Sequence, residues 1–168
     1  TFCGSLAHAD PASEWCLVAA TLDATMTARS VRGARQIAAR DYFQGVMATA
    51  LAPDELLVEV RLPILPADTR FGFREFNRRA GDFAIAMVLA TYRLRNGVMA
   101  EPRVGVGGAE THPRRIADAE RALDGKAPGA AAFAAAADAA AAVMDPMEDV
   151  NTSAEYRRDL VRTLTRRA

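Results

Sequence analysis

The feature that most constrains the fold is a long apolar segment that turns back on itself. Residues 83–92 form an almost unbroken apolar run, and Asn96-Gly97 follows shortly after it. This dipeptide readily adopts the positive φ angles of a tight hairpin, so residues 98–108 are predicted to form the return strand. The chain is therefore expected to contain an antiparallel sheet.

Helices are predicted on either side of this hairpin in the chain. Asp10 and Pro11 are typical of a helix start, because a carboxylate can cap exposed amides and proline needs no donor there. A helix over residues 11–23 is therefore expected. Later helices are predicted over 114–123, 130–144 and 154–167, the second of them made almost wholly of alanine. Strands followed by helices favour an α+β fold over a doubly wound parallel sheet.

The segment before the hairpin reads as a smaller unit. Residues 25–37 are predicted to form a two-strand hairpin, residues 41–45 a helical turn ending at glycine, and residues 56–62 a strand. Two prolines, Pro63 and Pro66, then stiffen the chain and end that strand. We therefore predict a linker over 63–68 and two domains, 1–63 and 64–168.

Composition excludes several function classes. The 21 basic residues balance the 21 acidic ones, so bulk charge gives no reason to expect nucleic acid as a partner. No apolar run approaches the roughly 20 residues of a membrane span, and no signal peptide is recognisable. Two cysteines and two histidines are too few for an iron–sulfur cluster or a structural zinc site. We expect a cytoplasmic protein with reduced thiols, and we expect the chain to lack an N-terminal portion, since it begins at Thr1.

Residues 1–11 carry the strongest chemical signal. Small and hydroxyl side chains precede the predicted helix start at Asp10-Pro11. Small side chains let a phosphate reach backbone amides, and hydroxyl groups add further donors. Two interpretations stay open on these residues alone, an anion or cofactor loop and an ordinary loop that enters a helix.

This opening run closely resembles the second flavin-binding motif of the FAD-binding medium subunit of molybdenum hydroxylases, typified by aerobic carbon monoxide dehydrogenase and xanthine dehydrogenase. The usual form is Thr-Ile-Gly-Gly-Ser-x-Ala-His-Ala-Asp-Pro, and the chain reads Thr-Phe-Cys-Gly-Ser-Leu-Ala-His-Ala-Asp-Pro. Residues 49–57, 76–84 and 153–158 resemble the same family in the same order. The resemblance thus covers nearly the whole chain.

The resemblance implies a fold and a set of cofactor-binding residues. The fold would be the C-terminal half of an FAD-binding (PCMH-type) domain, followed by a small domain of an antiparallel sheet and helices. Glu14 would hold the polar stem of FAD, Leu57 would pack near the flavin end, and Arg74 matches a position often occupied by lysine. The remaining FAD-binding residues would come from the motif itself. Five of them would lie along the diphosphate: Thr1, Phe2, Cys3, Gly4 and Ser5. The sixth is Asp10.

The resemblance also implies a function. Substrate would be oxidised at a molybdenum cofactor in a large subunit, and electrons would cross 2Fe-2S clusters in a small subunit. FAD held by this chain would then pass them to an external acceptor. The protein would supply position and electrostatics, with no catalytic side chain and no metal of its own. The isolated chain is expected to be inactive.

Two departures from the family pattern support an alternative. The family's first, glycine-rich flavin motif has no counterpart in the chain, and Cys3 stands where glycine is usual. A side chain there could crowd the diphosphate or require a backbone conformation that glycine adopts more easily. The alternative is a truncated interaction module that binds no cofactor.

Other candidates have a simple and a functional interpretation. His8 could face the flavin or make a local hydrogen bond. Arg78 and Arg79 could form a subunit contact or be solvated. Tyr42 and Phe43 could approach the flavin ring or pack in the core, which is the commoner use of such residues.

Overall fold

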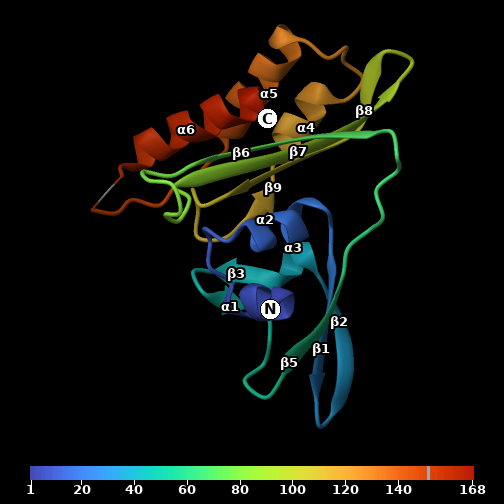
Figure 1. Ribbon diagram of the computed structural model, residues 1–168, viewed down its shortest axis with the longest axis vertical. Coiled ribbons are helices and arrows are strands. Elements are labelled where there is room, and N and C mark those ends of the chain that lie inside the picture. The colour runs from blue at the N-terminus through green and yellow to red at the C-terminus, as the bar shows by residue number, and fades with distance from the viewer. Residues whose placement is uncertain (151) are drawn as a thin grey trace.

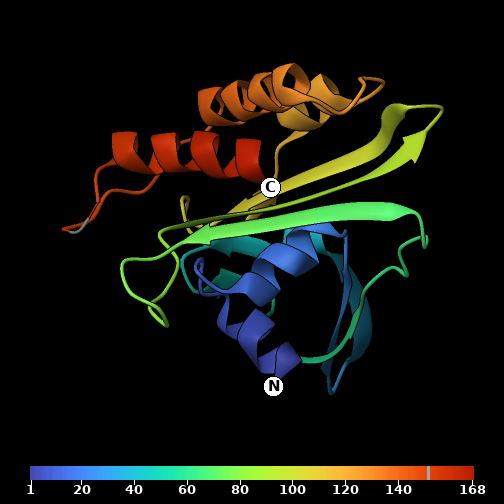
Figure 2. The same cartoon turned by 45° about the horizontal axis from the view of Figure 1, so that its top comes forward.

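The computed structural model describes residues 1–150 and 152–168. Its larger part is a four-stranded antiparallel sheet with helices on both faces (Figures 1 and 2). The strand order is β6 (Thr69–Phe76), β7 (Ala86–Arg95), β8 (Val98–Gly107) and β9 (Arg114–Arg115). One face carries α4 (Ala117–Leu123), α5 (Ala130–Ala142) and α6 (Ala154–Arg167), and the other face carries α2 (Glu14–Thr21).

The predicted central hairpin is confirmed. β7 and β8 pair antiparallel, and Asn96 and Gly97 at the turn have φ angles of 52° and 79°. β7 begins at Ala86 instead of residue 83, because residues 77–85 form a loop whose ends are joined by a hydrogen bond from Ile85 N to Phe76 O at 2.8 Å. The loop lies at the left-hand end of the sheet in Figure 1.

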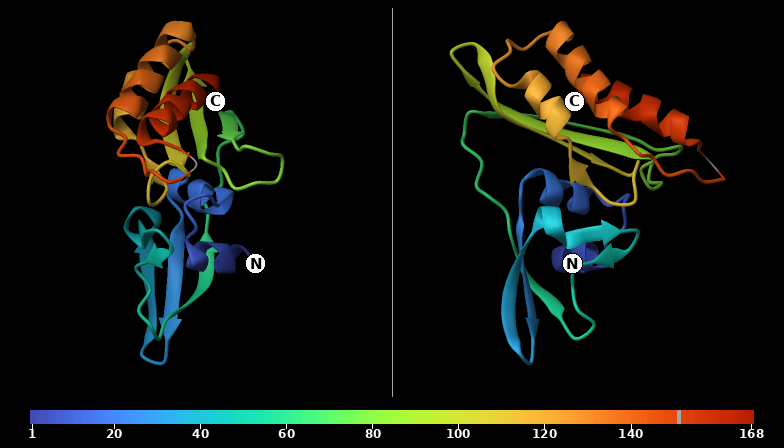
Figure 3. Two further views of the ribbon diagram at one scale, coloured as in Figure 1. Left: turned by 90° about the vertical axis from the view of Figure 1, so that its left-hand side faces the viewer. Right: turned by 180° about the vertical axis from the view of Figure 1, so that it is seen from behind.

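The smaller part of the molecule contains two further sheets. β1 (Thr25–Ser30) lies between β2 (Gly33–Ala38) and β5 (Leu56–Arg61), antiparallel to both. β3 (Phe43–Gly45) and β4 (Ala48–Thr49) form a short hairpin, flanked by α1 (Phe2–His8) and α3 (Ala39–Tyr42). Figure 3 shows these elements extending from the face of the four-stranded sheet opposite α4, α5 and α6.

Two expectations for the N-terminal residues are wrong. Residues 2–8 are helical instead of a loop, since the Thr1 side chain accepts a hydrogen bond from Gly4 N and Leu6 is fully buried. The second helix begins at Glu14, not at residue 11. Asp10 caps a turn instead, its Oδ1 accepting from Ala12 N at 2.8 Å.

Other boundaries differ for similar local reasons. The helical turn predicted over 41–45 is displaced: α3 ends at Tyr42, and Phe43–Gly45 is a strand. The helix predicted from residue 114 begins at Ala117, because Arg114–Arg115 pairs with β8. The hairpin predicted over 25–37 is confirmed by the pairing of β1 with β2.

Helix α2 joins the two parts because β8 presents glycines to it. A Cβ atom on Gly105 would lie 1.8 Å from Thr21 Oγ1, and one on Gly107 would lie 3.5 Å from Leu17 Cβ. The absence of side chains lets the helix and the strand approach closely. Among the described helices, none has the length and apolar character that crossing a membrane requires.

Candidate functional site

A groove runs between the N-terminal turn and the loop that precedes β7. It consists of two adjoining hollows of about 610 Å³ and about 360 Å³, each of a size typical of small-molecule sites. The two hollows share a border formed by the turn on one side and the loop on the other: Asp10, Ala12, Gly81, Asp82 and Phe83. We call the two hollows together the groove.

The first wall is built from the turn between α1 and α2. Ala9 ends α1 in the left-handed conformation, and the Asp10 carboxylate holds the next turn through Ala12 N. This path lets Ser5 and His8 on α1 face the same hollow as Glu14 and Trp15 on α2, and Ser13 lines it between them.

The second wall is the loop over residues 77–85. The Asn77 amide donates to Asp82 O at 3.3 Å, and Asp82 N donates to Arg79 O at 3.0 Å, so the loop is braced internally. Phe83, near the end of the loop, is 78% exposed although it is aromatic. Arg78 and Arg79 line the larger hollow from the same loop.

The third wall comes from the segment before α6 and from α6 itself. Met147, Asp149, Thr152 and Arg157 line the larger hollow. Asp149 Oδ1 accepts from Thr152 N at 2.9 Å, and Met147 N donates to Ala109 O at 2.8 Å. The wall is therefore fixed both within itself and to the end of β8.

The lining combines charge with aromatic surface. Acidic side chains lie on all three walls, whereas the arginines come from the loop and α6. Trp15 is on the first wall of the smaller hollow and Phe83 is on the loop that forms the second. Such a lining suits an elongated polar ligand that carries a flat ring and anionic groups. Within the described part of the chain, no group of three or more His, Cys, Asp or Glu residues is arranged to hold a metal ion.

The structure brings some of the predicted site residues together. Ser5, Asp10 and Glu14 all line the smaller hollow. Thr1, Phe2, Cys3 and Gly4 form the first turn of α1 and do not line either hollow. The Thr1 side chain occupies part of the space at this turn, because its Oγ1 accepts a hydrogen bond from Gly4 N at 3.0 Å.

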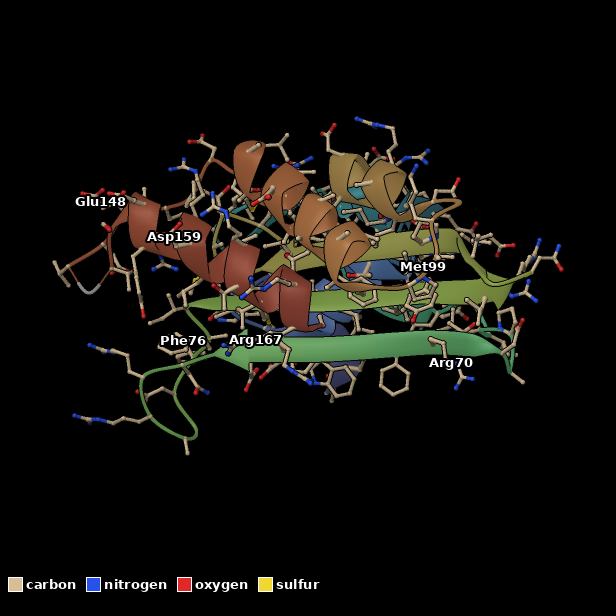
Figure 4. All side chains as sticks on the ribbon, turned by 90° about the horizontal axis from the view of Figure 1, so that it is seen from above. Arg70, Phe76, Met99, Glu148, Asp159 and Arg167 are labelled. Atoms are coloured by element: carbon tan, nitrogen blue, oxygen red, sulfur yellow. The ribbon has the colours of Figure 1, made fainter. Side chains whose placement is uncertain are left out.

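Two predicted residues lie away from the groove. Leu57 on β5 is opposite Ala28 and packs against the core of the smaller part. Arg74 on β6 is opposite Val88, whose side chain belongs to the core beneath α4, α5 and α6, so Arg74 is on the helix-covered face. Figure 4 looks down on that face and labels Arg70 and Phe76 toward the two ends of the same strand.

Sequence reasoning missed several groove residues. Val46 and Met47 form the exposed turn between β3 and β4, and their exposed apolar side chains were the available signal. Phe83 and Arg157 lie within family-like motifs, 76–84 and 153–158, but no role was predicted for either. Arg157 is 5% exposed, and no sequence pattern distinguishes a buried arginine from the exposed ones beside it.

Two candidates, Tyr42 and Phe43, belong to the core instead of the groove. Tyr42 and Phe43 are buried against one another with ring centroids 5.0 Å apart, so their interpretation as core residues is confirmed. Burial raises the pKa of the Tyr42 hydroxyl to about 12 and that of the Cys16 thiol to about 11. Both groups therefore stay protonated at neutral pH.

Comparison with protein families matches both parts of the chain. Residues 1–65 match the FAD binding domain in molybdopterin dehydrogenase, and residues 71–168 match the CO dehydrogenase flavoprotein C-terminal domain. The nicotine 6-hydroxylase medium subunit of Paenarthrobacter nicotinovorans is 40% identical over 99% of this chain and 58% of its own length. The carbon monoxide dehydrogenase medium chain of Afipia carboxidovorans is 30% identical over 100% of this chain and 58% of its own.

Solved structures agree with these matches. Carbon monoxide dehydrogenase from Hydrogenophaga pseudoflava, lacking the Mo-pyranopterin moiety of the molybdenum cofactor, superposes with a TM-score of 0.95 at 31% identity over 100% of this chain and 58% of that chain. Quinoline 2-oxidoreductase from Pseudomonas putida 86 gives 0.92 at 35% identity over 99% and 58%.

The predicted α+β fold and the family resemblance are thereby confirmed. The chain spans somewhat more than half the length of the relatives that it matches. It contains an FAD-binding domain, and in sequence and fold it belongs to the family of medium subunits of molybdenum hydroxylases.

Proposed function

We propose that this chain holds FAD in the groove and takes part in electron transfer within a molybdenum hydroxylase complex. The observation that carries the proposal is the position of Ser5, Asp10 and Glu14. Ser5 and Asp10 of the flavin-like motif, with Glu14 shortly after it, face the loop 77–85, which overlaps a second family-like motif, across a hollow of about 360 Å³. Two segments far apart in sequence thus form one site of the chemistry that the family match indicates.

The residues present fit FAD in their chemistry. Cationic Arg78 and Arg79 can neutralise phosphate charge, and Trp15 and Phe83 offer aromatic surface to a flat ring. Val46 and Met47 would limit the access of water at the rim. When bound, FAD supplies the redox chemistry, while the side chains of this chain bind it, orient it and shield it.

The wider assignment follows from the family. We propose that a small subunit with 2Fe-2S clusters delivers electrons, that a large subunit holds the molybdenum cofactor where substrate is oxidised, and that an external acceptor receives the electrons. The division at residues 63 and 64, the cytoplasmic location and the inactivity of the isolated chain are part of this proposal. The roles of Leu57 and Arg74 in it depend on the resemblance alone.

One observation favours the alternative, a cofactor-free interaction module. The Thr1 hydroxyl already accepts the hydrogen bond of Gly4 N, an amide that would otherwise face the diphosphate. The Gly4 amide at the first turn of α1 therefore already has a hydrogen-bond acceptor within the chain. FAD binding through this turn requires the Thr1 side chain to rotate away.

The experiment uses the full-length subunit in its native complex. FAD content is measured from the visible absorption of oxidised flavin. FAD is then removed and titrated back while tryptophan fluorescence is followed in the wild type and in Trp15→Phe, and the difference between the two reports on Trp15. We expect bound flavin and quenching of Trp15. A colourless complex whose Trp15 emission does not respond to FAD would contradict the proposal and support the interaction module.

A matched pair of variants locates the binding. Phe83→Ala removes an exposed ring from the groove and should weaken FAD binding roughly tenfold, since stacking on an aromatic side chain contributes ~1 kcal/mol or more. Val31→Ala, at the tip of the β1–β2 hairpin and fully exposed, should leave FAD affinity unchanged. Equal affinity in both variants would place the cofactor elsewhere.

A further inference from the structure

A buried arginine on α6 contacts two walls of the groove directly and is linked to the other wall through Gly108. Arg157 is 5% exposed and stands in the first turn of α6. Its backbone is fixed there, because Arg157 N donates to Ser153 O at 3.1 Å and the Ser153 hydroxyl caps the helix through Tyr156 N. A cation so deeply buried is costly unless several acceptors surround it.

The guanidinium donates to two backbone carbonyls and to one carboxylate. Nη1 donates to Ile85 O at 2.9 Å and to Gly108 O at 2.7 Å. Nη2 donates to Asp149 Oδ2 at 2.5 Å. The Ile85 carbonyl lies at the end of the loop 77–85, and Asp149 belongs to the third wall, so two walls meet directly at this group.

The first wall is reached through Gly108. Gly108 N donates to Pro11 O at 2.8 Å, while the carbonyl of the same residue accepts from Arg157. Gly108 has a φ of +75°, and a Cβ atom there would lie 3.0 Å from Ala84 O. The residue must therefore remain glycine to pass between the loop and the N-terminal turn.

The bonding pattern requires the shape of arginine. Two nitrogens on one rigid plane reach three acceptors on separate segments, whereas the single ammonium of lysine is a compact charge that cannot match this fork. Arg157 Nε is buried and has no hydrogen-bond partner among the described residues. The side chain thus keeps a buried donor unsatisfied while its other two nitrogens hold the three segments.

We infer that Arg157 is the positioning residue of the groove: it fixes the loop 77–85 against the N-terminal turn and the third wall, and thereby sets the affinity of the groove for its ligand. The part of this inference that concerns FAD rests on the proposed function. The part that concerns the loop does not.

The test compares Arg157→Lys and Arg157→Met with the wild type in the full-length subunit and its native complex. Arg162→Lys is the matched control, since Arg162 lies on the same helix and forms exposed ion pairs with Asp138 and Asp159. Amide hydrogen exchange is measured by segment. FAD affinity and the visible circular dichroism of bound flavin are measured in the same samples.

We expect faster exchange in residues 77–85 and 147–150 of both Arg157 variants, with the turn at Asn96-Gly97 unchanged. FAD affinity should fall at least tenfold, and the flavin dichroism should change. Arg162→Lys should match the wild type in every readout. Should Arg157→Lys and Arg157→Met fail to fold, Asp149→Asn perturbs the same guanidinium from a half-exposed partner and should raise exchange in residues 77–85.

Three results would overturn the inference. Unchanged exchange in residues 77–85 would show that Arg157 does not hold the loop. A uniform rise over the whole chain would reduce its role to overall stability. Unchanged FAD affinity with a loosened loop would separate the loop from binding. If the wild type binds no FAD, the proposed function fails, while the exchange pattern still decides whether Arg157 positions the loop.

Discussion

The two parts of the molecule differ in how completely their own packing buries their strands. In the C-terminal part, β6 and β7 pair without interruption from Thr69 opposite Arg93 to Phe76 opposite Ala86, beneath three helices. In the N-terminal part, the pairing of β1 with β5 shifts at residues 27–28, and much of β2 is exposed.

This difference indicates a division of labour. The groove takes its first wall from the N-terminal part and its other two walls from the C-terminal part. Helix α2, which lies in the N-terminal stretch of sequence, packs on β8 and carries Trp15 and Glu14 to the groove. The continuous sheet therefore acts as the frame on which the ligand-facing residues of the N-terminal part are held.

The largest expected effect comes from separating α2 from this frame. In Gly105→Val, the new side chain would begin 1.8 Å from Thr21 Oγ1 and 3.1 Å from Leu17 Cδ1, in a space without room for it. We expect a loss of about 3 kcal/mol in the free energy of unfolding, at the upper end of overpacking effects. Denaturant titration followed by Trp15 fluorescence and by circular dichroism measures the loss.

Gly129→Ala is the control for this substitution. Gly129 precedes α5 with a φ of 171°, and a Cβ atom there would meet nothing within 4 Å. Its unfolding free energy should remain within ~0.5 kcal/mol of the wild type. A small effect of Gly105→Val, comparable to that of the control, would mean that α2 does not depend on close packing against β8.

A smaller effect is expected from the ion pair between Asp23 and Arg115, which links the two parts in addition to the packing of α2. Asp23 Oδ2 lies 2.5 Å from Arg115 Nη1, and Arg115 also pairs with Glu120 of the C-terminal part at 2.8 Å. These carboxylates raise the pKa of the Arg115 guanidinium, with the hydrogen bond to Glu120 as the largest cause. A double-mutant cycle of Asp23→Asn and Arg115→Met should give a coupling energy of about 1 kcal/mol that decreases with salt.

The pair of Asp118 with Arg121 provides the comparison. Both side chains lie on α4 and are more exposed than Arg115. Their coupling should be ~0.3 kcal/mol, as for other exposed pairs on one helix. A coupling between Asp23 and Arg115 no larger than this would show that this ion pair does not strengthen the contact between the two parts.

The same contrast explains what the sequence could predict. The β7–β8 hairpin and helix α6 were predictable because apolar pattern, the Asn96-Gly97 turn and the Ser153 cap are local signals. The start of α2 was not, since Asp10 and Pro11 have all the features of a helix start. The Pro11 carbonyl accepts a long-range hydrogen bond from Gly108 N, so it is not used in a helix that begins at Pro11.

The groove was predictable only in part. The resemblance pointed to Ser5, Asp10 and Glu14, which the structure places together. It did not indicate that Thr1 would cap the first turn of α1 or that Arg157 would join three segments. Those roles depend on which backbone carbonyls come near a side chain in three dimensions, and neither composition nor spacing contains that information.

The smallest expected effect concerns pH and should appear in the N-terminal part alone. Arg35 on β2 donates to both carboxylate oxygens of Glu55, each at 2.7 Å, and Ala52 N donates to Glu55 Oε2 at 2.8 Å. The Arg35 hydrogen bonds, followed by that of Ala52, lower the pKa of Glu55 from its usual 4.5 to about 2. In an exposed and weakly packed sheet, this cluster ties β2 to the turn before β5.

The sign of the effect follows from the lowered pKa. The folded state prefers ionised Glu55, so the stabilisation is present above the pKa of the unfolded state and is lost as pH falls from 4.5 to about 2. Glu55→Gln should therefore be less stable than the wild type at neutral pH, with the two converging near the acid end. Hydrogen exchange in β2, measured across this range, should rise with acid in the wild type and be less dependent on pH in the variant.

Glu59→Gln is the matched control, because Glu59 pairs with Arg61 on its own strand, and its hydrogen bond to another element comes from Thr27 Oγ1 on β1 at 3.4 Å instead of from β2. It should leave exchange in β2 and its pH dependence as in the wild type. Exchange in β7 should not change with either variant, since the hydrogen bonds of Glu55 involve only residues of the N-terminal part. A parallel rise in β2 and β7 would instead show that the two parts respond to acid as one unit, and the contrast between them would fail.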